Sequence, residues 1–365
     1  MHDACEGHTA FLYDRGGITR IGELGPLISL QWQRIRDDIS VAQVVMKNPD
    51  CAAIASQVEP GRHELVIFRG GHRVWEGPIT LATYERAQTT IEAKDVVHYL
   101  ERLIMRNAYN NAYPNVVTTV QRALNIISGE LPRREAEDPP VNVLPYLHGI
   151  HQDDDAKTAR NTLPFQKTVF DDLDDLAAKS GIDYTCLGRS IFIFDTHTLL
   201  GRTPTLTESD IVGDVVVSVY GMDLATFAAV SGADGTYGSS GEQDAYYGWV
   251  EILASAYDEN ADADEEAPTQ AELNSQAERN LSGRNPTPVN VRIPDGSTLN
   301  PNGPISLDDL VPGVEVPLLA TMTGRTFSQM QKLDKVDVAD SEAGETIQIT
   351  LSPASALAGQ IDEGE

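Results

Sequence analysis

The sequence predicts an α+β, β-rich protein in which two β-rich stretches flank a small α/β module. Short apolar runs bounded by Gly, Pro, Asn and Asp dominate residues 1–105 and 206–352, and such runs are typical of strands. Residues 106–205 instead contain two segments with apolar side chains at helical spacing, followed by a hairpin. Of the 365 residues, 41% are hydrophobic, which is enough for more than one packed core.

The first β-rich stretch is organised around residues 63–93. Four strand-like runs predict an antiparallel meander that can curl into a small barrel: Leu65–Phe68, Arg73–Glu76, Ile79–Tyr84 and Thr89–Ala93. Paired glycines suit the first hairpin turn, and a Gly-Pro pair predicts a bend between the second and third runs. Further strands are expected at residues 11–13, 26–35 and 40–46. A helix then opens at Lys94, with four apolar residues on one face: Val96, Leu100, Leu103 and Ile104.

The α/β module begins with a predicted helix over residues 115–128. Val117, Val120, Leu124 and Ile127 share one face of this helix, and Gly129 is expected to be its C-cap. Residues 130–163 are rich in proline and acidic residues and lack apolar periodicity, so we expect a long surface loop there.

A second helix, over residues 168–179, has the best-marked ends. Thr168 and Asp171 form a capping pair at its start, and Gly181 ends it. The four aspartates at 171, 172, 174 and 175 are expected largely on its other, solvated faces. A hairpin follows at residues 182–194.

The second β-rich stretch, 206–352, contains several strand-like runs. Val215–Tyr220 is one, and we expect Ala225–Val230 to pair with it. Residues 232–241 are rich in Gly and Ser and are expected to form a mobile loop. The remaining expectations are strands at 246–254, 288–293 and 346–351, an acidic loop insert at 258–267, a helix at 270–281 and a flexible C-terminal tail at 353–365.

Charge limits the classes of partner. Asp and Glu number 55 against 27 Lys and Arg, and the resulting net charge of −28 repels nucleic acid and anionic membranes. Acidic residues follow at once after the best basic cluster, Arg133–Arg134, so no sequence-specific nucleic-acid binding is expected. No apolar stretch approaches the roughly 18 residues of a membrane span, and no signal peptide is visible, so we expect synthesis in the cytoplasm.

The cysteines predict no disulfide framework. Cys5, Cys51 and Cys186 are odd in number and far apart, which also argues against a four-ligand zinc site. Cys186 lies in a strand-like run, where burial would raise its pKa and make the thiol inert.

No catalytic, cofactor-binding or metal-binding residue is predicted. His148 and His151, with Asp153–Asp155 after them, lack the remaining ligands of a metal site. Asp171–Asp175 lacks the loop spacing of a calcium site. Gly238–Gly241 lacks the strand-to-helix elbow of a serine hydrolase.

Two other classes of function stay open. The first is a glycan or peptidoglycan hydrolase, because carboxylates are abundant and the sequence does not give their separations. The second is a carbohydrate-binding module that uses Trp75 or Tyr246–Tyr247 as stacking platforms, although a strand-end Trp is more often core or interface.

Several segments in a fixed order resemble a known family. They are L-Y-D-R-G-G at 12–17, the strand through Trp32, the hairpin through Trp75–Ile79, Ile91–Asp95 with its helix, the helix and hairpin at 165–194, and D-L-V-P-G at 309–313. Together they resemble a siphophage minor tail protein of the baseplate-hub or tail-tip class, of the type found in phages of actinobacteria.

The resemblance implies an architecture and a role. Such hubs have two β-barrel-like domains per chain with an α/β module between them, and they form homotrimers whose barrels make a ring. The chain would then join the tail tube and distal tail ring to tip proteins and line the DNA exit channel. The implied partners are a second and third copy of itself, the distal tail protein, the tape measure protein and other minor tail proteins. It would be made in the host cytoplasm, reside at the virion tail tip, and have no enzymatic activity or cofactor.

Overall fold

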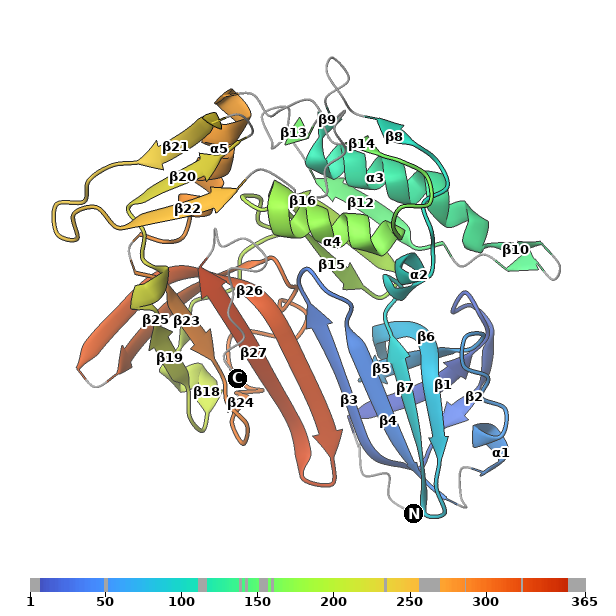
Figure 1. Ribbon diagram of the computed structural model, residues 1–365. Helices are drawn as coiled ribbons and strands as arrows, with labels where there is room; N and C mark the ends of the chain where they lie inside the picture. Colours follow the sequence, from blue (N-terminus) through green and yellow to red (C-terminus); the bar gives the residue numbers. More distant parts are fainter. Residues whose placement is uncertain are drawn as a thin grey trace.

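The computed structural model describes residues 7–48, 52–110, 117–137, 140–141, 144–150, 157–158, 161–232, 235–255, 270–285, 287–322 and 324–353. One large sheet fills the lower part of Figure 1, and an α/β module and a smaller helix-and-strand module lie above it. Five predicted features lie outside the described residues: Cys5, Cys51, His151, Asp153–Asp155 and the acidic insert 258–267. Nearly all of the expected tail, 353–365, also lies outside them.

Thirteen strands form the large sheet. Its main path runs in space through β19 (Val216–Val219), β23 (Val289–Arg292), β27 (Gly344–Pro353), β26 (Arg325–Ser341), β3 (Leu27–Ile35), β4 (Val41–Lys47), β7 (Gln88–Lys94), β6 (His72–Tyr84), β5 (Glu64–Arg69), β1 (His8–Tyr13) and β2 (Arg20–Leu24). Two further strands lie off this path: β25 (Glu315–Met322) pairs with β26, and β17 (Leu206–Thr207) pairs with β25.

The long strand β26 joins the two β-rich stretches. Its first half pairs with β25, its second half pairs with β3 from Lys335 to Ser341, and β27 pairs along its other side. One hydrophobic core serves both stretches, since it contains Trp32 and Val44 from the first together with Val316 and Ile349 from the second. The described strands form no closed barrel, so the two barrel-like domains are not confirmed.

The predicted meander is present with one strand fewer. The second and third predicted runs are a single strand, β6, which pairs with β5 up to Pro78 and with β7 from Ile79 onward. The Gly77–Pro78 bend therefore marks the point where β6 changes its pairing partner from β5 to β7, and the strand continues through it. The helix expected from Lys94 is only the short α2 (His98–Glu101), and Ile104 is 52% exposed because the chain has already left the helix.

The α/β module packs α3 (Thr119–Glu130) and α4 (Val169–Ser180) against β12 (Tyr146–Ile150), β15 (Ile182–Leu187) and β16 (Ser190–Asp195). The predicted ends of α4 are confirmed: Thr168 and Asp171 form a capping box, and Gly181 has a left-handed φ of 72°. The predictions for α3 are partly wrong, because Thr118 is its N-cap and Gly129 lies inside it. Part of the expected 130–163 loop is ordered as β12, which pairs in parallel with β16.

A small module is formed by β20 (Phe227–Ser231), β21 (Tyr237–Gly241), β22 (Glu251–Ser255) and α5 (Gln270–Leu281). The helix predicted at 270–281 is confirmed as α5, but its association with these strands in a separate module was not predicted. Two expectations are wrong here: β20 pairs with β21 and β22 instead of β19, and β21 lies where a mobile loop was expected. Alternate residues of β20, Ala228 and Val230, pack with Leu273 and Ala277 of α5 and so cover an apolar face of this helix.

The remaining elements are short. They are α1 (Ala52–Ala55), β8 (Tyr109–Asn110) with β14 (Asn161–Thr162), β9 (Val117–Thr118) with β13 (Lys157–Thr158), β10 (Ala136–Glu137) with β11 (Pro140–Val141), β18 (Ile211–Val212) with β24 (Thr298–Leu299), η1 (Leu131–Arg134), η2 (Glu208–Asp210) and η3 (Gly221–Asp223). No helix in the described ranges is both long enough and apolar enough to cross a membrane.

The Gly77→Ala substitution tests the crossing of β6 between its partners. A Cβ at Gly77 would lie 1.9 Å from the carbonyl oxygen of Lys94, so the backbone of β6 or β7 must shift. We expect the free energy of unfolding to fall by about 1–3 kcal/mol, measured by denaturant titration. Gly221→Ala is the matched control, because a Cβ there meets no atom within 4 Å. Equal effects of the two substitutions would contradict the prediction.

Candidate functional site

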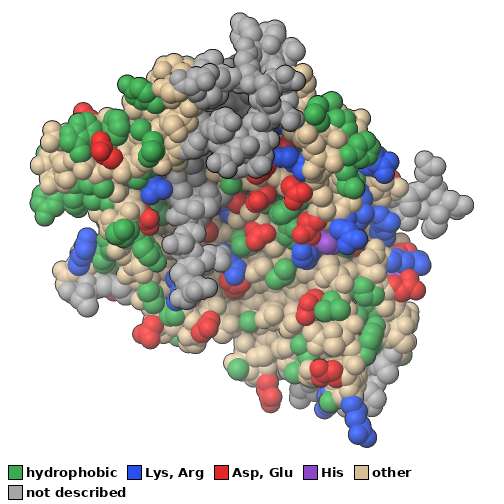
Figure 2. Space-filling model, viewed as in Figure 1, with side chains coloured by type: hydrophobic (Ala, Val, Ile, Leu, Met, Phe, Trp, Pro, Cys, Tyr) green, Lys and Arg blue, Asp and Glu red, His purple; other side chains and the backbone are tan. Residues whose placement is uncertain are grey.

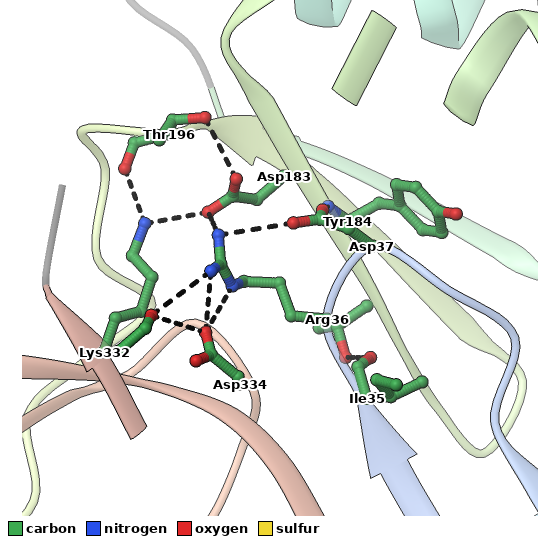
Figure 3. Close-up of polar contacts among 10 residues, drawn as sticks. Ile35, Arg36, Asp37, Asp183, Tyr184, Thr196, Lys332 and Asp334 are labelled. Atoms are coloured by element: carbon green, nitrogen blue, oxygen red, sulfur yellow. Dashed lines mark hydrogen bonds and ion pairs between the residues drawn. The ribbon is translucent and has the colours of Figure 1, made fainter. Parts of the chain in front are cut away.

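A buried network of charged side chains lies where the two β-rich stretches and the α/β module meet (Figure 3). Arg36 and Asp37 follow directly after β3, Asp183 lies in β15, and Lys332 and Asp334 lie in β26. The exposed fraction of each of these side chains is between 0% and 9%. Charged groups at this depth need partners, because an isolated ion is costly to remove from water.

Asp183 is the carboxylate that the two cations share. Its Oδ2 lies 3.0 Å from Nη1 of Arg36 and 2.8 Å from Nζ of Lys332. Arg36 also pairs with Asp334 at 2.6 Å, and Lys332 donates to the main-chain oxygen of Thr196 at 2.5 Å. Each of the three parts of the chain thus contributes at least one charge.

The pKa shifts show how the charges balance. Burial raises the pKa of Asp183, but Arg36 and Lys332 outweigh burial and hold this pKa below its ordinary value. Burial and the neighbouring Asp183 raise the pKa of Asp37 well above its ordinary value. Burial also raises the pKa of Asp334, so Asp183 is the carboxyl of the three whose charged form the two cations favour.

A second network attaches the α/β hairpin to the first β-rich stretch. Nη1 of Arg189, in the turn between β15 and β16, lies 2.6 Å from Oε2 of the buried Glu64. Glu64 also accepts hydrogen bonds from the hydroxyl of Tyr99 at 2.5 Å and from the main-chain N–H of Gly16 at 2.9 Å. This carboxylate therefore fixes β5, the turn after β1 and the short helix α2 to one another.

A third set of contacts attaches β1 and β5 to the last hairpin. Nδ1 of His8 lies 2.8 Å from Oδ2 of Asp340, and Nε1 of Trp32 donates to Nε2 of His8 at 3.2 Å. Arg69 forms a bidentate pair with Glu345, at 2.7 and 2.6 Å. These side-chain contacts therefore join the same two β-rich stretches that β26 joins through its backbone hydrogen bonds.

Asp95 is a buried carboxyl at the point where β7 turns into α2. It accepts hydrogen bonds from the main-chain N–H groups of Ser40 at 2.8 Å and Val97 at 2.9 Å. Burial raises the pKa of Asp95 to about 6, and the like charge of Asp38 adds to this. The indole of Trp75 donates to the hydroxyl of Ser40 at 3.1 Å, so the tryptophan belongs to the same junction.

The residues that were considered for metal binding do not form a site. His148 lies in β12 and stacks on Phe192 with ring centroids 4.7 Å apart. Asp171 caps α4, whereas Asp172 is buried 3.7 Å from Arg122 and is an exception to the expectation that these aspartates lie largely on solvated faces. Within the described part of the chain, no group of three or more His, Cys, Asp and Glu side chains is placed to hold a metal ion.

The remaining candidate residues of the sequence analysis are either buried or exposed to solvent. Burial raises the pKa of the Cys186 thiol well above its ordinary value, as predicted. Trp75 is 3% exposed, so it is a core residue and the stacking role considered for it is wrong. Tyr246 and Tyr247 are 87% and 43% exposed, and their rings meet edge to face at 88°. Asp244 holds this tyrosine pair by accepting both of their main-chain N–H groups.

Comparison with known proteins gives a likeness of fold. The chain is similar to the 43 kDa tail protein of prophage MuSo2 from Shewanella oneidensis, with 13% identity and a TM-score of 0.60 over 96% of this chain and 99% of that one. It is similar to a tail protein from Neisseria meningitidis MC58, with 10% identity and a TM-score of 0.62 over 97% and 99% of the two chains. The prophage tail protein gp18 from Listeria monocytogenes EGD-e gives 9% identity and a TM-score of 0.64 over 94% of both chains.

The predicted resemblance to phage tail proteins is therefore confirmed at the level of the fold. No protein-family model matches the chain, and neither does any curated protein. Function does not follow from fold alone.

The Asp183→Asn substitution tests the shared carboxylate. It keeps the shape of the side chain but leaves Arg36 and Lys332 buried without the charge that they share. We expect the free energy of unfolding to fall by about 3–5 kcal/mol, measured by denaturant titration. Glu23→Gln, in the exposed pair with Arg20, should change it by less than about 0.5 kcal/mol. A loss at Asp183 no larger than this control would contradict the assigned role.

Asp95 predicts a specific pH dependence. Since its pKa is raised from 3.8 to about 6, the folded chain holds this proton more tightly than the unfolded chain. The stability that Asp95 contributes is thus fully present below about pH 4 and is lost as the pH rises through about 6, a change of about 3 kcal/mol. Denaturant titrations between pH 4 and 7 should show this slope in the native chain and a flatter profile in Asp95→Asn. Parallel profiles would show that another group is responsible.

Proposed function

We propose that the chain is a structural component of a phage tail, the baseplate hub of a siphophage virion. In this role it joins the tail tube and distal tail ring to tip proteins and lines the DNA exit channel. The observation that carries the proposal is the likeness of fold, over at least 94% of both chains, to three prophage tail proteins. The order of sequence segments supports the same class independently.

The internal connections suit a part that bears load. The shared strand β26, the Asp183 network and the His8–Asp340 contact each connect segments that are far apart in the sequence. A body held at several points keeps its shape when neighbouring proteins are attached to it. Within the proposal, residues 1–105, 106–205 and 206–352 remain the three domains of the hub.

Exposed apolar side chains offer surface for such neighbours. Among the described residues, those more than half exposed are Ile18, Tyr84, Ile104, Tyr146, Leu163, Phe165, Val212, Met222, Tyr237, Tyr246, Trp249 and Leu253. Tyr237 and Leu253 lie on the face of the β20–β22 sheet that α5 does not cover. Exposed apolar patches of this kind are typical of protein interfaces, and a ring of copies would cover them.

The proposed partners are further copies of this chain, the distal tail protein, the tape measure protein and other tip proteins. The chain would be made in the host cytoplasm and act at the tail tip of the virion. The net charge of −28 suits a channel lining that repels DNA and does not retain it.

A carbohydrate-binding module is the second candidate, and the exposed loop around Tyr246 and Tyr247 is the observation that favours it. Retention of the chain on cell-wall glycan, lost in Tyr246→Ala, would favour the module. Turnover of that glycan would favour a hydrolase.

The hub proposal predicts the mass of the particle. The purified chain should form a trimer at micromolar concentration, measured by sedimentation or light scattering, and a ring in electron micrographs. Leu253→Glu, at a side chain that is 78% exposed on the uncovered face of β20–β22, should weaken the trimer if that face is an interface. A monomer at every concentration, together with turnover of cell-wall glycan, would overturn the proposal in favour of the hydrolase.

A further inference from the structure

Three arginines from distant parts of the sequence gather beside α2. Arg15 lies in the turn after β1, Arg102 directly follows α2, and Arg134 ends η1. Nη2 of Arg15 donates to the main-chain oxygen of Arg134 at 2.7 Å. Figure 2 shows Lys and Arg side chains gathered on this face in the region of α2. We refer to Arg15, Arg102 and Arg134 as the arginine cluster.

The arginine cluster is not neutralised from within the chain. Burial lowers the pKa of Arg134, and the charges of Arg15 and Arg102 lower it further. None of the three forms an ion pair with a carboxylate in the described residues, although the chain has 55 acidic residues for 27 basic ones. The Nε atoms of Arg15 and Arg134 are buried and have no hydrogen-bond partner. Like charges held together in this way cost free energy that an anion would remove.

Two acidic side chains close in sequence to the arginine cluster, Glu101 and Glu130, already have partners. Glu101 pairs with Lys94 at 3.0 Å and also with His98. Glu130 pairs with Arg133 and accepts the main-chain N–H groups of residues 106 and 107. The carboxylates of Glu101 and Glu130 are therefore engaged elsewhere and do not neutralise the arginine cluster.

The arginine cluster rests on a fixed base. The guanidinium of Arg134 lies over the ring of Tyr99, 5.2 Å from its centroid. Tyr99 is itself buried, and its hydroxyl donates to Glu64 at 2.5 Å. A guanidinium stacked on an immobile ring keeps its planar fork of donors in one orientation, so little entropy is lost when it binds an anion.

From this geometry we infer that the arginine cluster binds a carboxylate-rich segment of a neighbouring protein. Guanidinium groups pair with carboxylates through two parallel hydrogen bonds. Arg15 and Arg134 are half-buried and Arg102 is exposed, an arrangement that suits carboxylate side chains projecting from a partner protein. A DNA duplex fits less well, because the net charge of −28 acts against a long polyanion over its whole length. If the chain acts in a phage tail as proposed, the partner would be another tail protein. The inference of a carboxylate-rich partner depends on the arginine cluster and not on that role.

The test uses the full chain and a fluorescein-labelled decaglutamate peptide. Fluorescence anisotropy at about 50 mM salt should show binding that weakens steeply as salt is added. The double variant Arg102→Gln with Arg134→Gln should weaken binding at least about tenfold. The control is Arg20→Gln with Arg86→Gln, which removes the same charge from exposed positions elsewhere and should weaken binding less than about twofold.

Three results would overturn the inference: no binding by the native chain, equal losses in the two double variants, or tighter binding of a short DNA duplex through the same arginines. If the double variant does not fold, Arg102→Gln alone serves, because that side chain is exposed; it should still weaken binding more than Arg20→Gln does. The outcome is separate from that of the hub proposal. A monomer that binds the peptide would contradict the hub alone, and a trimer that ignores the peptide would contradict the arginine cluster alone.

Discussion

The ion pairs of Asp183 with Arg36 and Lys332 connect three parts of the chain that no short-range contact could bring together. The carboxylate belongs to the hairpin of the α/β module, one cation follows a strand of the first β-rich stretch, and the other lies in β26. A buried ion network of this kind gives little net stability compared with apolar packing, but it tolerates few alternative arrangements. It therefore specifies how the module sits on the sheet, while the shared hydrophobic core supplies most of the stabilisation.

Local signals in the sequence are sufficient to predict those helices and hairpins whose ends are fixed by capping or turn residues within the same segment. The ends of α4 follow from its capping box and from Gly181, and the hairpin that follows is formed by adjacent runs. The likeness to tail proteins was predictable for a related reason, since it rests on the order of such elements along the chain. No single motif was needed for it.

Pairing over long distances could not be predicted in the same way. The run at 26–35 is strongly strand-like, yet nothing in it indicates that its partner lies in β26, near the other end of the sequence. Two separate barrels were a reasonable expectation, because each stretch has enough strands to close on itself. The networks were missed because Arg36 and Asp37 stand at the end of an alternating strand, where charged residues usually face water. Lys332 and Asp334, inside a strand of mixed polarity, carried the one available signal, since charges inside a strand indicate buried partners.

The pairing of β26 with β3 also affects how the protein can be made. On the ribosome, β3 emerges about 300 residues before the strand that completes its sheet, and at roughly 5–20 residues per second this delay is about 15–60 s. During that time β3 presents an unpaired edge, of the kind that pairs with other chains. A topology dominated by such distant contacts also folds slowly. Expression at low temperature or with chaperones, rather than a change of sequence, is therefore the first remedy if the recombinant chain aggregates.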